Sequence, residues 1–258
     1  MKTPLLILKI GGNVLADDDV LNEVLDWLAG QPQLTILVHG GGRRASELQR
    51  VLGHEPKMVN GRRITDEATL EVVTMVYAGL VNKTLVARLQ ARQCPAIGLS
   101  GADGNLIEAH RRVVKDIDYG YAGDIDRVNV SLLQTLLSAG LCPVCCPITH
   151  DRRGQLLNTN ADTIAASLAT ALAPHYAVSL QYCFEKAGVL TNPEDETSVI
   201  PILKPDLYRQ HVEAGAIHSG MIPKLDNAFS ALKAGVEEVV VGHQQSLIAQ
   251  TATRIRLQ

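Results

Sequence analysis

Aromatic residues are scarce in this sequence: Phe, Trp and Tyr make up 3% of its 258 residues. Proteins that bind single-stranded nucleic acid use aromatic rings on which bases stack, so this shortage argues against that class. The formal net charge of −3 also provides no broad basic surface for phosphate backbones or acidic lipid headgroups. We therefore expect no nucleic-acid partner and no membrane partner.

Long apolar runs are missing as well. No stretch approaches the roughly 18 apolar residues that a membrane-spanning helix needs. The apolar start "MKTPLLILKIGG" is too short for a signal peptide, and no small-residue cleavage site follows it. These observations predict a cytoplasmic protein.

The sequence has five cysteines, and an odd number in a chain of this length is not typical of a disulfide framework. Cys142 and Cys145 form a C-x-x-C in "LCPVCCPI", but a structural zinc site needs four ligands and no second pair occurs. The preferred interpretation is a short buried strand in which cysteine acts as a small hydrophobic residue. No protein-ligated metal is expected.

Apolar residues make up 46% of the chain, enough for a sizeable core. Strand-length apolar runs alternate with amphipathic segments of helix length, which predicts βαβ units and an α/β fold with a mainly parallel sheet. The expected strands are 5–10, 34–39, 95–100, 142–148, 176–180 and 237–242. The expected helices are 18–30, 42–52, 65–93, 129–139, 160–172, 205–215 and 221–235. Residues 104–128 are polar and Gly-rich and predict hairpins or loops.

Two of the expected strands end in glycines, Gly11-Gly12 and Gly40-Gly41-Gly42. Ligands of α/β sheets bind beyond the carboxyl ends of the strands. Glycine brings backbone N–H groups close to a ligand, and a following helix N-terminus favours anions. One such loop could be a tight turn that needs glycine for packing alone. Two of them favour a phosphate or oxyanion site.

Common anion-binding motifs fit these loops poorly. Gly40-x-Gly42-x-x-Ala45 matches a loose dinucleotide fingerprint, but the region that follows, "EPKMVNGRRITD", does not end a clear strand with an acid. No Walker A loop occurs, and the HGGG segment lacks the G-x-S-x-G nucleophile elbow of an esterase. A dinucleotide enzyme would also leave "NTNAD" and "GMIPK" unexplained.

Three charged residues suggest phosphoryl transfer. Lys9 lies inside an apolar strand, where an unpaired buried ammonium is costly, so it either extends to the strand end or meets an anion there. Lys224 and Asp162 lie at the starts of two expected helices, and each alone could be an ordinary terminal charge. Together they provide what phosphoryl transfer requires, which is charge stabilisation with little covalent help from the protein.

The segments "ILKIGG", "LVHGGG", "NGRRIT", "LNTNAD" and "SGMIPK" occur in this order across nearly the whole chain. They resemble the motif set of the amino acid kinase family, in particular its N-acetylglutamate kinases. The resemblance implies one amino acid kinase domain over residues 1–258, a three-layer α/β/α sandwich with a mainly parallel central sheet. It implies an N-terminal lobe of about residues 1–170 for acylglutamate binding and dimerisation, and an ATP-binding C-terminal lobe of about residues 171–258. The lobe boundary is expected near residues 150–175.

The reaction implied is ATP-dependent phosphorylation of the γ-carboxylate of N-acetyl-L-glutamate in arginine biosynthesis, with Mg²⁺ held mainly by the nucleotide phosphates. The implied catalytic residues are two lysines that stabilise the transferring group and an aspartate that orients them: Lys9, Lys224 and Asp162. Substrate contacts are implied at Gly41, Gly42, Arg63 and Asn158, with the arginine gripping the α-carboxylate. Phosphate or nucleotide contacts are implied at Gly11, Gly12 and Gly188.

The sequence departs from the family pattern in two places. The acid expected near the nucleotide is altered in "QYCFEKAGVL" (181–190), where Glu185 or Lys186 could replace it, so adenine and ribose contacts stay open. The stretch "SGADGNLIEAHRR" replaces the usual ending of a strand and hairpin, and in the family that hairpin lies near the acyl group. The acyl group is therefore open between acetyl, which is preferred, and succinyl.

Other possibilities are another kinase of the family, against which Arg63 and Asn158 argue, and a regulator of the same fold that has lost catalysis. Lys9 lies too near the N-terminus for the additional helix of arginine-inhibited hexameric relatives. The resemblance thus implies a homodimer that arginine does not inhibit, built on the helix 65–93.

Overall fold

The computed structural model describes residues 1–59, 61–192, 194–217 and 221–258. The chain forms two compact units. The first consists of Met1–Thr35 with Ala165–Gln258, and the second of Ile36–Ile164. Strands alternate with helices along much of the chain, and the described strand pairs are more often parallel than antiparallel, so the predicted α/β class is confirmed.

The sheet of the first unit is built around β1 (Thr3–Ile10), which pairs in parallel with β11 (Tyr176–Cys183). The next strands in order are β13 (Glu238–Gly242), β14 (Thr253–Ile255) and β12 (Ile202–Leu203), and only the β13–β14 pair is antiparallel. The last six residues of β1 are all buried. A strand covered on both faces reads as an unbroken apolar run, which is how β1 was recognised in the sequence.

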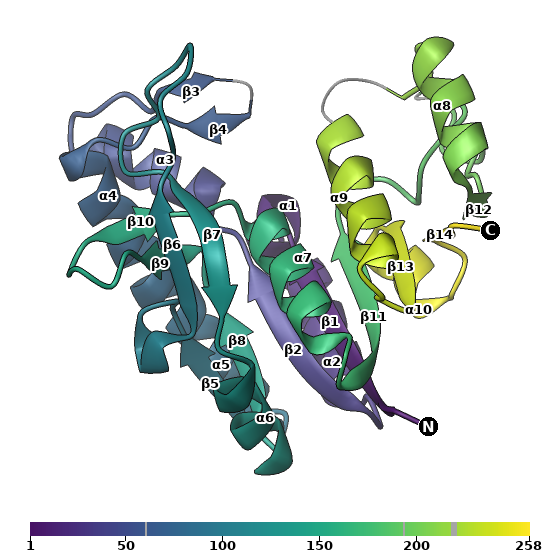
Figure 1. Ribbon diagram of the computed structural model, residues 1–258, viewed down its shortest axis with the longest axis horizontal. Helices are drawn as coiled ribbons and strands as arrows, with labels where there is room; N and C mark the ends of the chain where they lie inside the picture. Colours follow the sequence, from purple (N-terminus) through teal and green to yellow (C-terminus); the bar gives the residue numbers. More distant parts are fainter. Residues whose placement is uncertain (60, 193, 218–220) are drawn as a thin grey trace. The chain divides into compact units, whose positions relative to one another are not determined.

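Helices of the first unit include α1 (Gly12–Ala16), α2 (Asp18–Ala29), α8 (Pro205–Glu213), α9 (Ile222–Lys233) and α10 (Gln244–Ile248). Three of them, α2, α8 and α9, follow predicted segments closely, whereas the short helices α1 and α10 were not predicted. Asp17 caps α2 by accepting hydrogen bonds from the N–H groups of Asp19 and Val20. α9 runs beside β13 (Figure 1).

Three parallel strands form one sheet of the second unit, in the order β2 (Leu34–His39), β8 (Cys142–Cys145), β5 (Ala96–Leu99). β2 begins at the border with the first unit. The two cysteines of the C-x-x-C motif, with their neighbour Cys146, are buried as free thiols, as the strand interpretation predicted. Burial raises the pKa of Cys146 to about 12, so this thiol stays protonated at neutral pH.

A second sheet of this unit confirms the predicted hairpin in residues 104–128. It has the order β10 (Leu156–Asn158), β9 (Ile148–His150), β6 (Ile107–Arg111), β7 (Gly123–Val128), and β6 and β7 are antiparallel. A two-stranded ribbon, β3 (Met58–Val59) with β4 (Arg62–Arg63), lies outside both sheets. The remaining helices begin near their predicted positions: α3 (Gly42–Val51), α6 (Val130–Ser138) and α7 (Ala161–Leu172).

The long helix expected at 65–93 has an irregular centre. It consists of α4 (Glu67–Thr74), a π-helical segment (Met75–Val81) and α5 (Asn82–Gln90), and Asp66 caps it through the N–H of Thr69. The stretch Glu67–Gln90 is long and apolar enough to cross a membrane by length and composition. Its inner side, however, packs into a core cluster with α3 and the region of β9. A helix packed against a protein core passes the same test.

Candidate active site

The glycine loop of the second unit connects β2 to α3. Gly41 has φ of +156°, and a Cβ at this position would lie 2.8 Å from the ring of Tyr77. Only glycine fits both the conformation and the space. The loop therefore opens directly into the first turn of α3, where backbone N–H groups have no acceptor within the helix.

Arg63 is fixed beside this loop. It is 7% exposed, and its guanidinium donates to the carbonyl of Gly42 at 2.8 Å, to Oγ of Ser46 at 2.7 Å and to Oε1 of Gln49. Burial raises the pKa of Tyr77, which also hydrogen-bonds Arg63. All four partners are neutral. Among the described residues no carboxylate lies within ion-pair distance of Arg63, so its positive charge is available to an anionic ligand.

A pocket of about 180 Å³ lies at this point, entirely within the second unit. It brings together the four residues predicted to contact substrate: Gly41, Gly42, Arg63 and Asn158. Asn158 ends β10, and its side-chain amide donates to Oγ1 of Thr65 at 3.0 Å. The pocket thus combines a fixed cation, a glycine loop at a helix start and an oriented amide.

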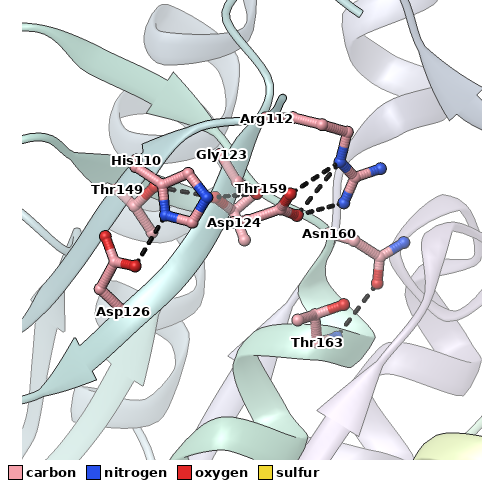
Figure 2. A network of polar contacts seen from close by, with 9 residues as sticks. All are labelled: His110, Arg112, Gly123, Asp124, Asp126, Thr149, Thr159, Asn160 and Thr163. Carbon is pink, nitrogen blue, oxygen red and sulfur yellow. Dashed lines mark hydrogen bonds and ion pairs between the residues drawn. The ribbon is translucent and has the colours of Figure 1, made fainter. Parts of the chain in front are cut away.

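Asp162 lies in the first turn of α7, immediately after two residues that line the same pocket, Asn160 and Ala161. The side-chain oxygen of Asn160 accepts the N–H of Asp162 at 2.8 Å and, as Figure 2 shows, the N–H of Thr163 at 3.1 Å. Asn160 therefore caps α7. The position of Asp162 at a helix start was predicted from the sequence, whereas its capping residue was not.

Lys9 and Gly11 lie together in the first unit. Lys9 is largely buried, with 8% exposure. A Cβ atom placed on Gly11 would lie 3.8 Å from Nζ of Lys9. Gly12 is the first residue of α1. Lys224 is partly buried in the first turn of α9. Parts of two motifs lie outside the described residues: Ser219 and Gly220 of "SGMIPK", and Asn60 of "NGRRIT".

Gly188 has no space for a side chain, because a Cβ there would lie 2.5 Å from Oγ1 of Thr253. It lines a small, mainly apolar pocket of the first unit with Lys186, Val189, Leu190, Ala216, Ile217 and Met221. Lys186 forms an ion pair with Glu196. In the altered segment 181–190, Glu185 accepts a hydrogen bond from the amide of Asn13 at 3.4 Å.

Residues 4–243 match the family model described as the amino acid kinase family. The chain belongs to this family. It is 53% identical over 241 residues to the acetylglutamate kinase of Phocaeicola vulgatus, covering 93% of this chain and 94% of that protein. It is 49% identical over 251 residues to the acetylglutamate kinase of Parabacteroides distasonis, covering 97% and 98%. The fold also matches the structure of N-acetylglutamate synthase from Neisseria gonorrhoeae, with a TM-score of 0.84 at 24% identity over 98% of this chain and 59% of that one.

A buried polar network that was not predicted from the sequence supports the glycine loop of this amino acid kinase. His39 is fully buried, with Nδ1 at 2.7 Å from the carbonyl of Gly40 and Nε2 at 3.1 Å from the amide nitrogen of Asn82. The same amide nitrogen donates to the carbonyl of Val144 at 2.9 Å. Both ring nitrogens are satisfied by a neutral imidazole that donates to Gly40 and accepts from Asn82.

Burial lowers the pKa of His39 to about 4, with a smaller effect from the charge of Lys83 and an opposing one from the Gly40 carbonyl. The unfolded chain, with a histidine pKa near 6.5, therefore binds more protons than the folded chain between pH 6.5 and 4. The neutral ring makes its full contribution to the free energy of unfolding above pH 6.5. This contribution, up to about 3 kcal/mol, is lost as the pH falls towards 4.

We expect the free energy of unfolding of wild type to fall between pH 7.5 and 5.5 by about 1 kcal/mol more than that of His39→Asn, measured by urea denaturation. Asparagine can still donate to the Gly40 carbonyl but cannot take up a proton. His54→Asn, at an exposed position, serves as the matched control and should keep the wild-type pH dependence. Equal pH dependence in wild type and His39→Asn would contradict the neutral buried ring.

Two further arginines line the pocket of Arg63, namely Arg62 and Arg112. Arg112 follows β6 and binds Asp124 on β7, with Nε 3.1 Å from each carboxylate oxygen and Nη2 also bonded (Figure 2). This ion pair lowers the pKa of Asp124, chiefly through the hydrogen bond from Arg112. Arg112, which follows β6, thereby contributes a paired charge to one wall of the pocket, and this was not predicted from the sequence.

Proposed function

We propose that this protein catalyses ATP-dependent phosphorylation of the γ-carboxylate of N-acetyl-L-glutamate, giving N-acetyl-L-glutamyl 5-phosphate and ADP, a step of arginine biosynthesis. The observation that carries the proposal is Arg63, a buried cation held only by neutral partners beside the glycine loop. Relatives at 49–53% identity over more than nine tenths of the chain are named acetylglutamate kinase, which supports the same substrate.

In this proposal the guanidinium of Arg63 binds the α-carboxylate and the amide of Asn158 contacts the acylated amino acid. The γ-carboxylate lies at Gly41 and Gly42, where N–H groups stabilise the negative charge that develops as it becomes an acyl phosphate. A carboxylate nucleophile is already ionised at neutral pH, so the reaction needs no general base. The role of the pocket is to orient the acceptor and to stabilise charge.

ATP supplies the phosphoryl group. We place the nucleotide base against the apolar residues beside Gly188, and the phosphates at Gly11 and Gly12 beside Lys9. We propose that Lys9 and Lys224 stabilise the transferring group and that Asp162 orients these lysines. In the described part of the chain no three His, Cys, Asp or Glu side chains gather as metal ligands, and we propose that Mg²⁺ is held mainly by the nucleotide phosphates.

Hydroxylamine trapping of the acyl phosphate tests the function. Mg-ATP is supplied with N-acetyl-L-glutamate, free glutamate or aspartate, and the hydroxamate is measured by its iron complex. We expect hydroxamate with N-acetyl-L-glutamate and background with the two free amino acids. Hydroxamate from free glutamate or aspartate instead would indicate another kinase of the family, and none from any acceptor despite ATP binding would indicate a regulator.

We further propose a homodimer that arginine does not inhibit, formed on the outer side of the helix Glu67–Gln90. Met75 and Leu80 are 53% and 51% exposed on this helix and offer apolar surface to a second copy of the chain. Light scattering of wild type should give twice the chain mass, and Met75→Glu should shift the equilibrium to monomer. A hexamer, or inhibition by millimolar arginine, would overturn this proposal.

A further inference from the structure

A second, larger hollow of about 530 Å³ adjoins the pocket of Arg63 within the second unit, against about 180 Å³ for that pocket. The two share Arg62 and Arg112 as lining residues. The larger hollow continues along the segment after β6, past Lys115, Asp116 and Tyr119 to Asp124. A ligand in the pocket of Arg63 can therefore extend past these two arginines into the hollow.

The charges in the hollow do not balance. Arg112 is neutralised by Asp124, and its guanidinium also lies 5.6 Å from the ring centre of Tyr119. Lys115 and Asp116 are exposed and contribute one charge of each sign. The positive charge of Arg62 is therefore not balanced by a carboxylate among the lining residues.

Arg62 has no side-chain hydrogen bond or ion pair with any residue that the structure describes, although it is partly buried. Burial lowers its pKa, and the nearby charge of Arg112 lowers it further, while Asp124 acts in the opposite direction. The negative charge of an anion bound at Arg62 would offset both effects, because it favours the charged form of the guanidinium. Neighbouring side chains of a strand point to opposite sides, so Arg62 does not compete for the acceptors that hold Arg63 on the same short strand β4.

We propose that Arg62 binds a second carboxylate beside the acylglutamate pocket. The inference rests on the proposed function, because Arg63 is already assigned to the α-carboxylate and a monocarboxylic acyl group carries no charge for Arg62. The carboxylate has two sources, the far end of a dicarboxylic acyl chain on the substrate or a separate dicarboxylic acid bound next to it. A guanidinium is suited to either because it binds a carboxylate through two parallel hydrogen bonds.

Two substrates whose acyl chains have equal length separate the effect of a terminal carboxylate from the effect of chain size. N-butanoyl- and N-succinyl-L-glutamate both have four-carbon acyl chains, and only the second ends in a carboxylate. For wild type we expect kcat/KM to be about tenfold or more higher with the succinyl than with the butanoyl compound, as for a hydrogen bond to a charged group. Arg62→Met should bring this ratio close to one. Arg153→Met, an exposed arginine that lines neither hollow, should keep the wild-type ratio.

The other source is tested with free succinate and N-acetyl-L-glutamate. Wild type could turn over the succinyl and butanoyl compounds equally well while free succinate changes its KM for N-acetyl-L-glutamate. If succinate also leaves the KM of Arg62→Met unchanged, the carboxylate belongs to a separate molecule and the subsite at Arg62 stands. If neither the succinyl chain nor succinate has any Arg62-dependent effect, the subsite is wrong while turnover of N-acetyl-L-glutamate leaves the proposed function intact.

If no acylglutamate is phosphorylated, the function fails, and calorimetric titration of both four-carbon compounds into wild type and Arg62→Met still decides the subsite. Loss of folding is excluded by thermal unfolding, since removal of an unpaired cation next to Arg112 should not lower the midpoint.

Discussion

Replacing Lys9 by methionine is expected to lower kcat by about 100- to 1000-fold, the effect of removing one preorganised group that stabilises transition-state charge. Lys9 is 8% exposed at the end of β1, and its ammonium lies close to Gly11, where we propose that the phosphates pass. Methionine keeps the length and packing of the side chain and removes only the charge. Because the lost contact is stronger in the transition state, kcat should fall far more than either KM rises.

Lys224→Met provides the parallel measurement on the first turn of α9, with the same expected loss in kcat. Its matched control is Lys233→Met, which removes an exposed lysine from the last turn of the same helix and should keep wild-type kinetics. Circular dichroism and thermal unfolding establish that each variant folds. A near wild-type kcat in either Lys9→Met or Lys224→Met would show that the lysine does not stabilise the transferring group.

Arg63→Met is expected to raise KM for N-acetyl-L-glutamate by about 100-fold, as loss of a buried charge-assisted contact typically costs 2–5 kcal/mol. At saturating acceptor, kcat should fall much less, because the α-carboxylate is remote from the reacting oxygen. Stability should also fall by about 1–3 kcal/mol, since the Gly42 carbonyl and Gln49 amide oxygen lose their donor.

Arg63→Lys separates the charge of this residue from its geometry. A lysine keeps the positive charge but cannot form the fork that reaches Gly42, Ser46 and a ligand together. We expect an intermediate KM from steady-state kinetics at saturating Mg-ATP, with KM for ATP unchanged. A wild-type acceptor KM in Arg63→Met would assign the α-carboxylate to another group.

Local features of this protein followed from the sequence alone. β1 is buried on both faces and therefore reads as an unbroken apolar run, and α2 shows apolar residues at helical spacing. The glycine loop at 40–42 was also visible, because a turn from a strand into a helix leaves its signature in adjacent residues. Burial pattern, capping and turn chemistry all act over a few residues, which is why reading along the chain detects them.

Short or irregular elements were not predictable in this way. The two-residue strands β3 and β4 carry too few residues to show a period, yet they position Arg62 and Arg63. The centre of the helix 67–90 is π-helical, although its apolar pattern is that of an ordinary α-helix. Tyr77 lies in this segment with its ring against Gly41, a contact that depends on packing rather than on local propensity.

The sequence by itself determined the α/β class, the glycine loops and the residue types that phosphoryl transfer needs. Tertiary structure alone decided which groups surround them. The amide of Asn82 reaches His39 across 43 positions, and Asn158 reaches Thr65 across 93. Folding likewise pairs Asp124 with Arg112, and this leaves the charge of Arg62 without a carboxylate partner among the described residues. Contacts between residues so far apart leave no periodic trace in either segment, since each segment's local pattern records only whether it is buried and not by what.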